Sequence, residues 1–442
     1  MSTTGDEGPR VTVFWLHLRN SPIRWALPAM IGLNLALLFF RSRYWIGVWP
    51  ETGAAGQMGT YFVGALGAGA AAWAAGAPTR HRLQEQLVAA RVRAITVEAY
   101  RLAATVAVLL VPYLVGQAVA VAFTAWSSPP GFQLWAGYFA LGLVAMLLAV
   151  CWGWILGKLL GSIFASLTAA VGWLVLIILA EDYLGITINA LRGPPERMVD
   201  PVAVGLQLAM LVILLATLPL LAKTSRILGH VRPAFMPAVA AIGVVVVMSA
   251  TTTIVDREPI RDRAHCVQGE RTMLCVWPEH EKYVPLLEQV NERIDALPES
   301  LIVPPRMNEH GVERTQFIDD EGYINTIEGL PPTFMIIEGS PWSYTGAIAG
   351  TIMSETWGDC FRRDRSDADR LRTHALSAWL NAYLAGSGSP DFSTNAPPDV
   401  EAAWAEGRAM AEASLTEQFT WVEREITDLR QSYCPDPDAL PA

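Results

Sequence analysis

The sequence predicts an α-helical polytopic membrane protein with about seven transmembrane helices, followed by a disulfide-bonded α+β extracytoplasmic domain. Three observations support this fold class: few charged residues, long apolar stretches confined to the first part of the chain, and four cysteines confined to the second. Of 442 residues, 52% are hydrophobic and 17% are charged, whereas soluble domains usually carry about 25% charged residues. This composition indicates a membrane protein.

The charges divide the chain into two unlike parts. Residues 1–252 contain 9 acidic and 16 basic residues, and residues 253–442 contain 33 acidic and 16 basic residues. We therefore expect an N-terminal cytoplasmic or interfacial helix in 1–24, a transmembrane bundle in 25–252 and an extracytoplasmic domain in 253–442. Phosphate binding needs clustered Lys and Arg, and the acidic part has one lysine, Lys282, so nucleic acid is excluded as a partner.

Seven apolar stretches are candidates for membrane spans, each of which needs about 20 mostly apolar residues. The second is weakly hydrophobic, but its small residues favour close helix packing in lipid. The fourth and fifth together are too long for one helix, so we expect a tight hairpin at Lys158. The predicted spans are 25–40, 59–77, 102–126, 134–156, 160–180, 202–222 and 234–250.

The basic residues in the short loops predict the orientation. One alternating set of loops holds twelve Lys and Arg and the other set holds four. The positive-inside rule therefore places the N-terminus in the cytoplasm, and seven spans then place 253–442 outside it. We expect a multi-pass cell-membrane protein without a cleavable signal peptide in its first 24 residues. Abundant alanine, and arginine in place of lysine, are typical of a GC-rich bacterial genome.

The cysteines agree with this orientation. Cys151 lies in the fourth span, and the other four lie in the acidic part, where an even number in an oxidising compartment predicts a disulfide framework. Four cysteines allow three pairings. We prefer Cys266 with Cys275, which bracket a turn between two short strands, and Cys360 with Cys434; free thiols are the alternative. No C-x-x-C and no His pair at ligand spacing occur, so a metal site is not expected.

Two amphipathic segments flank the first spans on the predicted cytoplasmic side. Residues 11–22 predict a short helix in the membrane interface. In the loop 79–93, apolar residues recur at helical spacing, which predicts a second helix. Its charged residues are Arg80, Arg82, Glu85, Arg91 and Arg93. This helix either docks a cytoplasmic partner or is a solvated connector whose arginines only set the topology.

The predicted spans contain no ionisable residue at their centres. Proton relays and ion paths usually need such residues, so a proton-driven carrier is disfavoured. Asn34, Gln117 and Gln207 are the main polar residues within the spans, and we expect them to join helices by hydrogen bonds. If the bundle moves a substrate, its energy comes from another molecule.

This layout resembles the ABC-2 type permeases, the membrane subunits of a class of ABC exporters. In that family an interfacial helix precedes the first span, a coupling helix between the second and third spans docks a separate ATPase, and a short insertion lies between the fifth and sixth spans. By position these features correspond to 11–22, 80–93 and 181–200. The resemblance covers roughly residues 10–225 and rests on layout rather than on a sharp motif.

The resemblance implies two kinds of partner: a cytoplasmic ABC ATPase that binds ATP and Mg, and a second permease chain in a homodimer or heterodimer. The chain itself has no G-x-x-x-x-G-K-[ST] motif, so we expect no ATPase activity and no cofactor in it. It departs from the family in its seventh span and its C-terminal domain of about 190 residues.

The predicted outer domain has helices in 279–297, 374–385 and 400–430, a strand in 333–337 and a loop in 386–398. It contains neither H-E-x-x-H nor G-x-S-x-G, so a hydrolase is not supported. We expect surface positions for His280, His310 and the acidic run Asp319, Asp320 and Glu321, and core packing rather than ligand contact for the aromatic residues of 341–344.

Two functions remain after this survey. The first is a membrane-spanning permease subunit of an ABC exporter, energised by the ATPase that docks between spans 2 and 3. The alternative is a non-transporting membrane anchor that displays an extracytoplasmic recognition domain. The neighbouring gene would distinguish them, because an adjacent ATPase with a Walker motif favours the first.

Overall fold

The computed structural model describes residues 14–19, 21–40, 43–80, 94–161, 163–221, 232–313, 316–318, 324–326, 330–337, 339–358, 366–386 and 396–433. The chain divides into two compact units. The first, here called the helical unit, comprises Met1–Gly193 and Arg197–Val255, and the second, the C-terminal unit, comprises Pro194–Glu196 and Asp256–Ala442.

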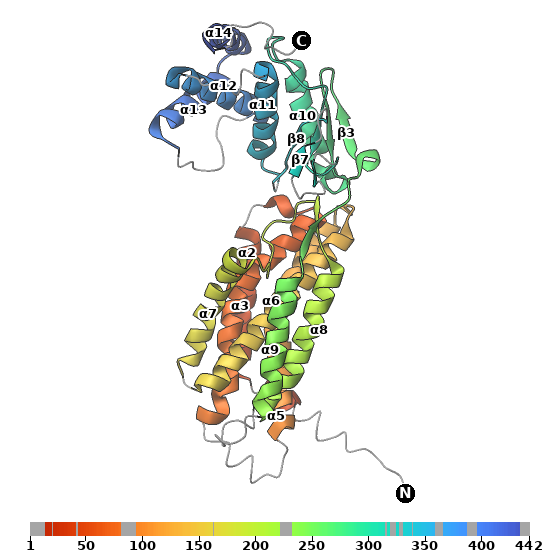
Figure 1. Cartoon of the computed structure of the whole chain (residues 1–442), viewed down its shortest axis with the longest axis vertical. Helices are drawn as coiled ribbons and strands as arrows, with labels where there is room; N and C mark the ends of the chain where they lie inside the picture. The colour runs from red at the N-terminus through yellow and green to blue at the C-terminus, as the bar shows by residue number, and fades with distance from the viewer. Residues whose placement is uncertain are drawn as a thin grey trace. The chain divides into compact units, whose positions relative to one another are not determined.

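The helical unit is a bundle of long helices that run alongside one another (Figure 1). Two short 3-10 helices, η1 (Pro22–Trp25) and η2 (Arg43–Trp45), flank the helix at Leu27–Phe40. The described α-helices are α2 (Leu27–Phe40), α3 (Trp49–Arg80), α5 (Ala94–Ala125), α6 (Phe132–Leu160), α7 (Ala165–Leu184), α8 (Pro201–Thr217) and α9 (Arg232–Ala250).

Four helices in the described part of the chain are long and apolar enough to cross a membrane. Shorter apolar helices occupy Leu27–Phe40 and Met236–Ala250, and α3 has 32 residues but is rich in Gly and Ala. A helix therefore lies at each of the seven predicted positions, yet seven spans are not confirmed. The four long apolar segments are Ile95–Ala125, Phe132–Leu160, Ala165–Tyr183 and Pro201–Leu221.

The predicted hairpin at Lys158 is wrong in its position. Lys158 lies in the last turn of α6, and the helix ends two residues later. Gly161 caps it in the left-handed conformation with φ 58°, which glycine adopts without a steric penalty. The chain therefore reverses after Gly161, before α7 begins at Ala165.

Glycine and alanine bring α3 and α6 into close contact. A Cβ atom on Gly153 would overlap the carbonyl oxygen of Ala68, and one on Gly157 would overlap that of Ala72. Both alanines are fully buried. The small residues that make the second predicted span weakly hydrophobic are therefore the ones that let its backbone pack against α6, as in other membrane helix pairs.

The connection between α7 and α8 is hydrogen-bonded to α3. The side-chain amide of Asn189 donates a hydrogen bond of 2.9 Å to Thr60 Oγ1, and the backbone N–H of Ala190 donates one of 2.9 Å to Gln57 Oε1. All four residues are in or against the buried interior of the bundle, since Gln57 and Thr60 are fully buried and Asn189 is 3% exposed. The connection is thus part of the packed unit.

The C-terminal unit combines a small mixed sheet with helices, which agrees with the predicted α+β class. The sheet has the order β3-β4-β5-β8, antiparallel between the first two strands and parallel between the others. Its strands are β3 (His265–Gln268), β4 (Met273–Val276), β5 (Arg306–Glu309) and β8 (Thr333–Phe334). A separate two-stranded sheet pairs β6 (Gln316–Ile318) with β7 (Ile324–Thr326). Another pairs β1 (Arg197–Val199) with β2 (Ile254–Asp256), and all of it except Asp256 belongs to the helical unit.

The helices of the C-terminal unit partly match their predicted ranges. The predicted helix 279–297 is a 3-10 turn, η5 (Pro278–Tyr283), that continues as α10 (Val284–Asp295), and the strand predicted in 333–337 is shorter. The single helix predicted in 400–430 is wrong, because Ser414 begins a new helix there and its Oγ contacts Glu417. The remaining elements are η4 (Arg261–Arg263), α11 (Pro341–Trp357), α12 (Asp367–Ala385), α13 (Pro398–Ala411) and α14 (Leu415–Tyr433).

Residues 194–196 belong to the C-terminal unit although they precede α8. The backbone N–H of Arg257 donates a hydrogen bond of 2.7 Å to the carbonyl oxygen of Glu196, and its guanidinium donates one to the carbonyl oxygen of Pro195. Two separate stretches of chain therefore build this part of the unit.

A disulfide joins Cys266 and Cys275, as the sequence predicts. The two residues are opposite each other in the antiparallel β3–β4 pair, so the disulfide crosslinks the two strands of a hairpin. Cys360 and Cys434 lie outside the described residues, and their predicted pairing stays a prediction. Cys151 is a buried free thiol in α6.

We expect Gly153→Ala to destabilise the helical unit, because the added methyl group must push the α3 backbone away from α6. Overpacking of this kind costs about 1–3 kcal/mol, which thermal unfolding of the purified protein in detergent measures as a lower midpoint. Gly205→Ala is the matched control, since nothing lies within 4 Å of a Cβ atom there. Equal midpoints for the two variants would contradict the close contact.

Candidate functional site

Three ionisable side chains meet near the end of α6 and the start of α5. The carboxylate of Glu98 pairs with Arg101, at 2.9 Å from Nη1, and with Lys158. Glu98 is 4% exposed. Arg101 also donates a hydrogen bond to the carbonyl oxygen of Ala74 in α3. We call Glu98, Arg101 and Lys158 the ion cluster; it links α3, α5 and α6.

The indole ring of Trp154, in α6, lies next to both cations of the ion cluster. Arg101 Cζ lies 6.0 Å and Lys158 Nζ 5.8 Å from the centroid of its ring. Both distances are within the range in which a cation is attracted by the face of an aromatic ring. The two cations therefore have a shared carboxylate and a shared ring as partners.

The N-terminal segment lies beside this cluster. Residues 14–19 are helical. Among them, His17 is close enough to the ion cluster for the charges of Arg101 and Glu98 to act on its imidazole. Burial lowers the pKa of His17, the charge of Arg101 lowers it further, and Glu98 opposes both. On the same helix Trp15 and Leu16 are 59% and 55% exposed, as expected of a helix with an apolar face in the membrane interface.

The predicted docking residues are mostly outside the described part of the chain. Arg80 is the last residue of α3, and Arg82, Glu85, Arg91 and Arg93 lie outside the described residues. In sequence, the described helices on either side of residues 81–93 are α3, up to Arg80, and α5, from Ala94. The helix α5 supplies Glu98 and Arg101 to the ion cluster, and α3 accepts a hydrogen bond from Arg101 through the carbonyl oxygen of Ala74.

The polar residues within the helices join neighbouring helices, as the sequence predicts. Asn34 Nδ2 donates a hydrogen bond of 2.7 Å to the carbonyl oxygen of Pro112. The indole N–H of Trp135 donates one of 3.1 Å to Gln117 Oε1. Gln207 Nε2 donates to Thr251 and Thr253 at 3.2 and 3.0 Å. These contacts link α2 with α5, α5 with α6, and α8 with the residues that follow α9.

In the C-terminal unit, the predicted surface position of His280 is wrong. His280 is fully buried, and its Nδ1 lies 2.6 Å from Oε1 of Glu309, which is 2% exposed. The other carboxylate oxygen of Glu309 accepts a hydrogen bond of 3.0 Å from the backbone N–H of Trp277. The 3-10 turn that follows Trp277 directs the imidazole toward β5. Without exposed area, His280 has no access to a substrate in this conformation.

The other predicted candidates have simpler outcomes. His310 is exposed, as predicted, and Trp342 and Tyr344 are buried at 6% and 2% exposure, which confirms core packing. Asp319, Asp320 and Glu321 lie outside the described residues. Within the described ranges, no three His, Cys, Asp or Glu side chains are grouped as metal ligands would be.

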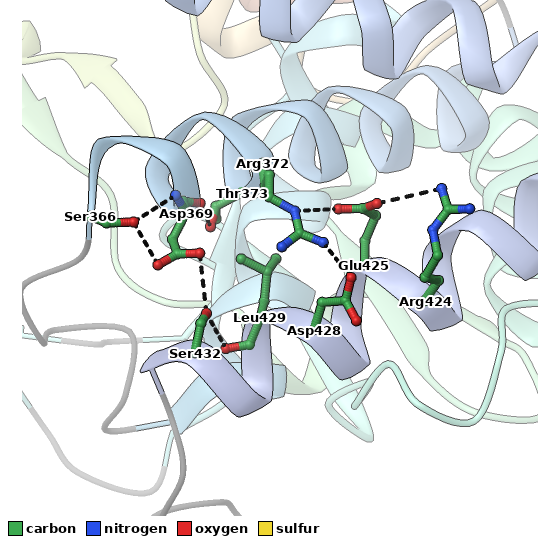
Figure 2. A network of polar contacts seen from close by, with 9 residues as sticks. All are labelled: Ser366, Asp369, Arg372, Thr373, Arg424, Glu425, Asp428, Leu429 and Ser432. Carbon is green, nitrogen blue, oxygen red and sulfur yellow. Dashed lines mark hydrogen bonds and ion pairs between the residues drawn. The ribbon is translucent and has the colours of Figure 1, made fainter.

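A polar network joins α12 to α14 (Figure 2). The guanidinium of Arg372 donates from Nε to Glu425 Oε2 at 2.7 Å and from Nη2 to Asp428 Oδ2 at 2.8 Å. The pKa of Arg372 is raised, chiefly by the hydrogen bond to Glu425. Burial opposes this rise, and the hydrogen bond to Asp428 adds to it. Further along the same helices, Ser432 Oγ donates to Asp369 Oδ1 at 3.1 Å.

A cavity of about 240 Å³ lies next to this network, between α12, α13 and α14. Its lining combines apolar side chains with three carboxylates and one guanidinium. The lining residues are Leu371, Arg372, Ala375, Asp399, Ala402, Ala403, Glu406, Trp421 and Glu425.

Comparisons of the chain with protein-family models, with curated proteins and with solved structures gave no match. Function therefore has to be inferred from the layout of the helices and from the contacts described above.

Sequence reasoning missed the ion cluster and the buried His280–Glu309 pair. The sequence predicted a hairpin at Lys158 and gave no role to Glu98 or Arg101. One signal was present: Glu98 and Arg101 are three residues apart at the start of an apolar helix, a spacing at which opposite charges meet. Nothing in the sequence indicated that Lys158, 60 positions away, reaches the same carboxylate.

We expect Glu98→Gln to destabilise the helical unit, because it leaves two largely buried cations, each 14% exposed, without their carboxylate. Removing one partner of a buried ion pair typically costs about 3–5 kcal/mol. Thermal unfolding in detergent measures the loss, with the exposed Glu181→Gln as control. Adding Lys158→Met should restore part of the stability, since one uncompensated charge is removed with it. No recovery in the double variant would contradict the pairing.

We expect Glu309→Ala to loosen the sheet of the C-terminal unit, because His280 and the Trp277 backbone N–H lose their shared acceptor. Hydrogen–deuterium exchange of the full-length protein should show faster exchange in β4 and β5. Glu258→Ala, at an exposed position, is the control and should leave these strands protected. Unchanged exchange in Glu309→Ala would show that the pair contributes nothing to the fold.

Proposed function

We propose that this chain is the membrane-spanning permease subunit of an ABC exporter. In this proposal the helices at the seven predicted positions cross the membrane, the N-terminus is cytoplasmic and the C-terminal unit is extracytoplasmic. A separate cytoplasmic ATPase docks on residues 80–93 and supplies the energy. A second permease chain, identical or related, completes the pathway.

One observation carries the proposal: α3 and α5, the helices on either side of residues 81–93, are joined to each other by Arg101 of the ion cluster. Ala74, near the end of α3, and Glu98 and Arg101, near the start of α5, flank residues 81–93 on either side and are connected to one another. Lys158 adds α6 to the same cluster. A displacement of the segment by an ATPase therefore acts on three helices together rather than on one.

The second support comes from the other half of α3. Gln57 and Thr60 hold the connection between α7 and α8, at the position where the family has its insertion. Ala74 lies about 25 Å from Gln57 along the same helix, at a rise of 1.5 Å per residue. Movement of α3 would therefore affect both the ion cluster and this connection, which is what alternating access to the two sides of a membrane requires.

The alternative function, a membrane anchor that displays a recognition domain, is favoured by the division of the chain into two compact units. In an anchor the docking segment has no partner. Its charged residues then serve only to set the topology, and their replacement leaves every complex of the protein unchanged. The two functions thus differ in a property that can be measured.

We expect the full-length protein to copurify with an ATPase subunit when the two are coexpressed, the ATPase being chosen from those with a Walker motif in the same genome. Reversing two charges with Arg91→Glu and Arg93→Glu should reduce the recovered ATPase about tenfold or more, because a docking helix loses its matching charges. Arg192→Glu and Arg197→Glu, in the loops of the opposite side, should have no effect.

Quantitative pull-down in detergent measures the ratio of ATPase to permease. Undiminished association of the Arg91 and Arg93 variant would contradict the docking role. Absence of any copurifying ATPase across the tested subunits would favour the anchor.

A further inference from the structure

The residues that line the cavity between α12, α13 and α14 favour one chemical class of ligand. On α13, Asp399 and Glu406 are seven residues apart, with Ala402 and Ala403 between them. Positions i, i+3, i+4 and i+7 share one face of a helix, so the two carboxylates flank two alanines. The alanines account for the hollow, because a longer side chain at either position would fill it.

The floor of the cavity is apolar and partly aromatic. Trp421 of α14 and Ala403 of α13 are 7% exposed, and Ala375 of α12 is 3% exposed. Beside the cavity a Cβ atom on Gly407 would overlap the carbonyl oxygen of Ala375, so α12 and α13 are in backbone contact there. The helices that frame the cavity are therefore held in place by packing rather than by an occupant.

The charges on the lining do not balance. Arg372 is the single cation on the lining, and it is bound by Glu425 and also by Asp428, which is outside the lining. Among the described residues, Asp399 and Glu406 form no hydrogen bond and no ion pair. Both side chains are exposed, and within the described ranges the side of the cavity formed by α13 therefore presents two carboxylates that no basic side chain pairs with.

The size and the ligand set exclude several occupants. At about 240 Å³, the cavity is larger than the ~150 Å³ that admits benzene and smaller than the roughly 300–1,000 Å³ of a drug-sized site. A hard metal ion takes six or more oxygen ligands, whereas of the three carboxylates on the lining one, Glu425, is already paired with Arg372. An anion would face the two carboxylates.

We propose that this cavity binds a small organic cation. Its ammonium group lies between Asp399 and Glu406, and its apolar body covers the ring of Trp421 and the alanines of α13. The aromatic face adds attraction for the positive charge. The Arg372–Glu425 pair forms the opposite wall. This site is independent of the transport proposal, since all its residues are in the C-terminal unit.

The test uses full-length protein in detergent and phenethylammonium as the probe, with 2-phenylethanol as its neutral analogue and phenylacetate as its anionic one. Ligand-observed NMR measures saturable binding. Because micelles also take up these compounds, binding is read as the difference from Ala402→Leu, whose side chain fills the cavity from an exposed position. We expect the cation to bind at least tenfold more tightly than the alcohol, and the anion not to bind.

The variants Asp399→Asn and Glu406→Gln, combined, should weaken binding of the cation at least tenfold. Glu401→Gln is the matched control, an exposed carboxylate on the same helix that is outside the lining, and it should bind as the unmodified protein does. Equal binding of cation and alcohol, an unaffected double variant, or no difference from Ala402→Leu would each overturn the proposal.

Discussion

The backbone contact between α3 and α6 is the constraint on which the rest of the helical unit depends. In a membrane, helices gain little from burying apolar surface against each other, so close packing of small residues has to supply the association. Gly153 and Gly157 allow that approach by the absence of a side chain. Because α3 is fixed in this way, it can hold the connection after α7 at one end and receive Arg101 at the other. A bulkier α3 would be more hydrophobic and would lose both relationships.

The charged residues follow from the same arrangement. A carboxylate with 4% exposure is stable only with partners, and the partners of Glu98 come from its own helix and from α6. These contacts, with the one from Arg101 to Ala74, thereby fix α3, α5 and α6 relative to one another. The interior polar residues act differently, since each joins a neighbouring helix through a neutral hydrogen bond. The unit thus keeps charge at its helix ends and hydrogen bonds along its length.

Much of the fold, but little of the candidate site, could be predicted from the sequence. Apolar runs predicted the positions of the helices, and the cysteines around Gln268–Glu270 predicted the hairpin disulfide, because both signals are local. The break between α13 and α14 was missed, since the apolar positions on either side of Ser414 continue one helical pattern. The burial of His280 depends on Glu309, 29 residues later, and the ion cluster and the cavity each need three helices. Contacts of this kind have no counterpart in composition, periodicity or spacing.

The short stretch Pro194–Glu196 has a consequence for how the protein can be divided. Arg257 binds the carbonyl oxygens of Pro195 and Glu196, and the same guanidinium lies 4.4 Å from the ring of Trp277 and pairs with Glu279 at 3.0 Å. A fragment that starts after α9 would lack the first two of these partners while keeping the others. The C-terminal unit is therefore discontinuous in sequence. A gene fusion or proteolytic cut that treats it as one uninterrupted segment would remove part of its own interior.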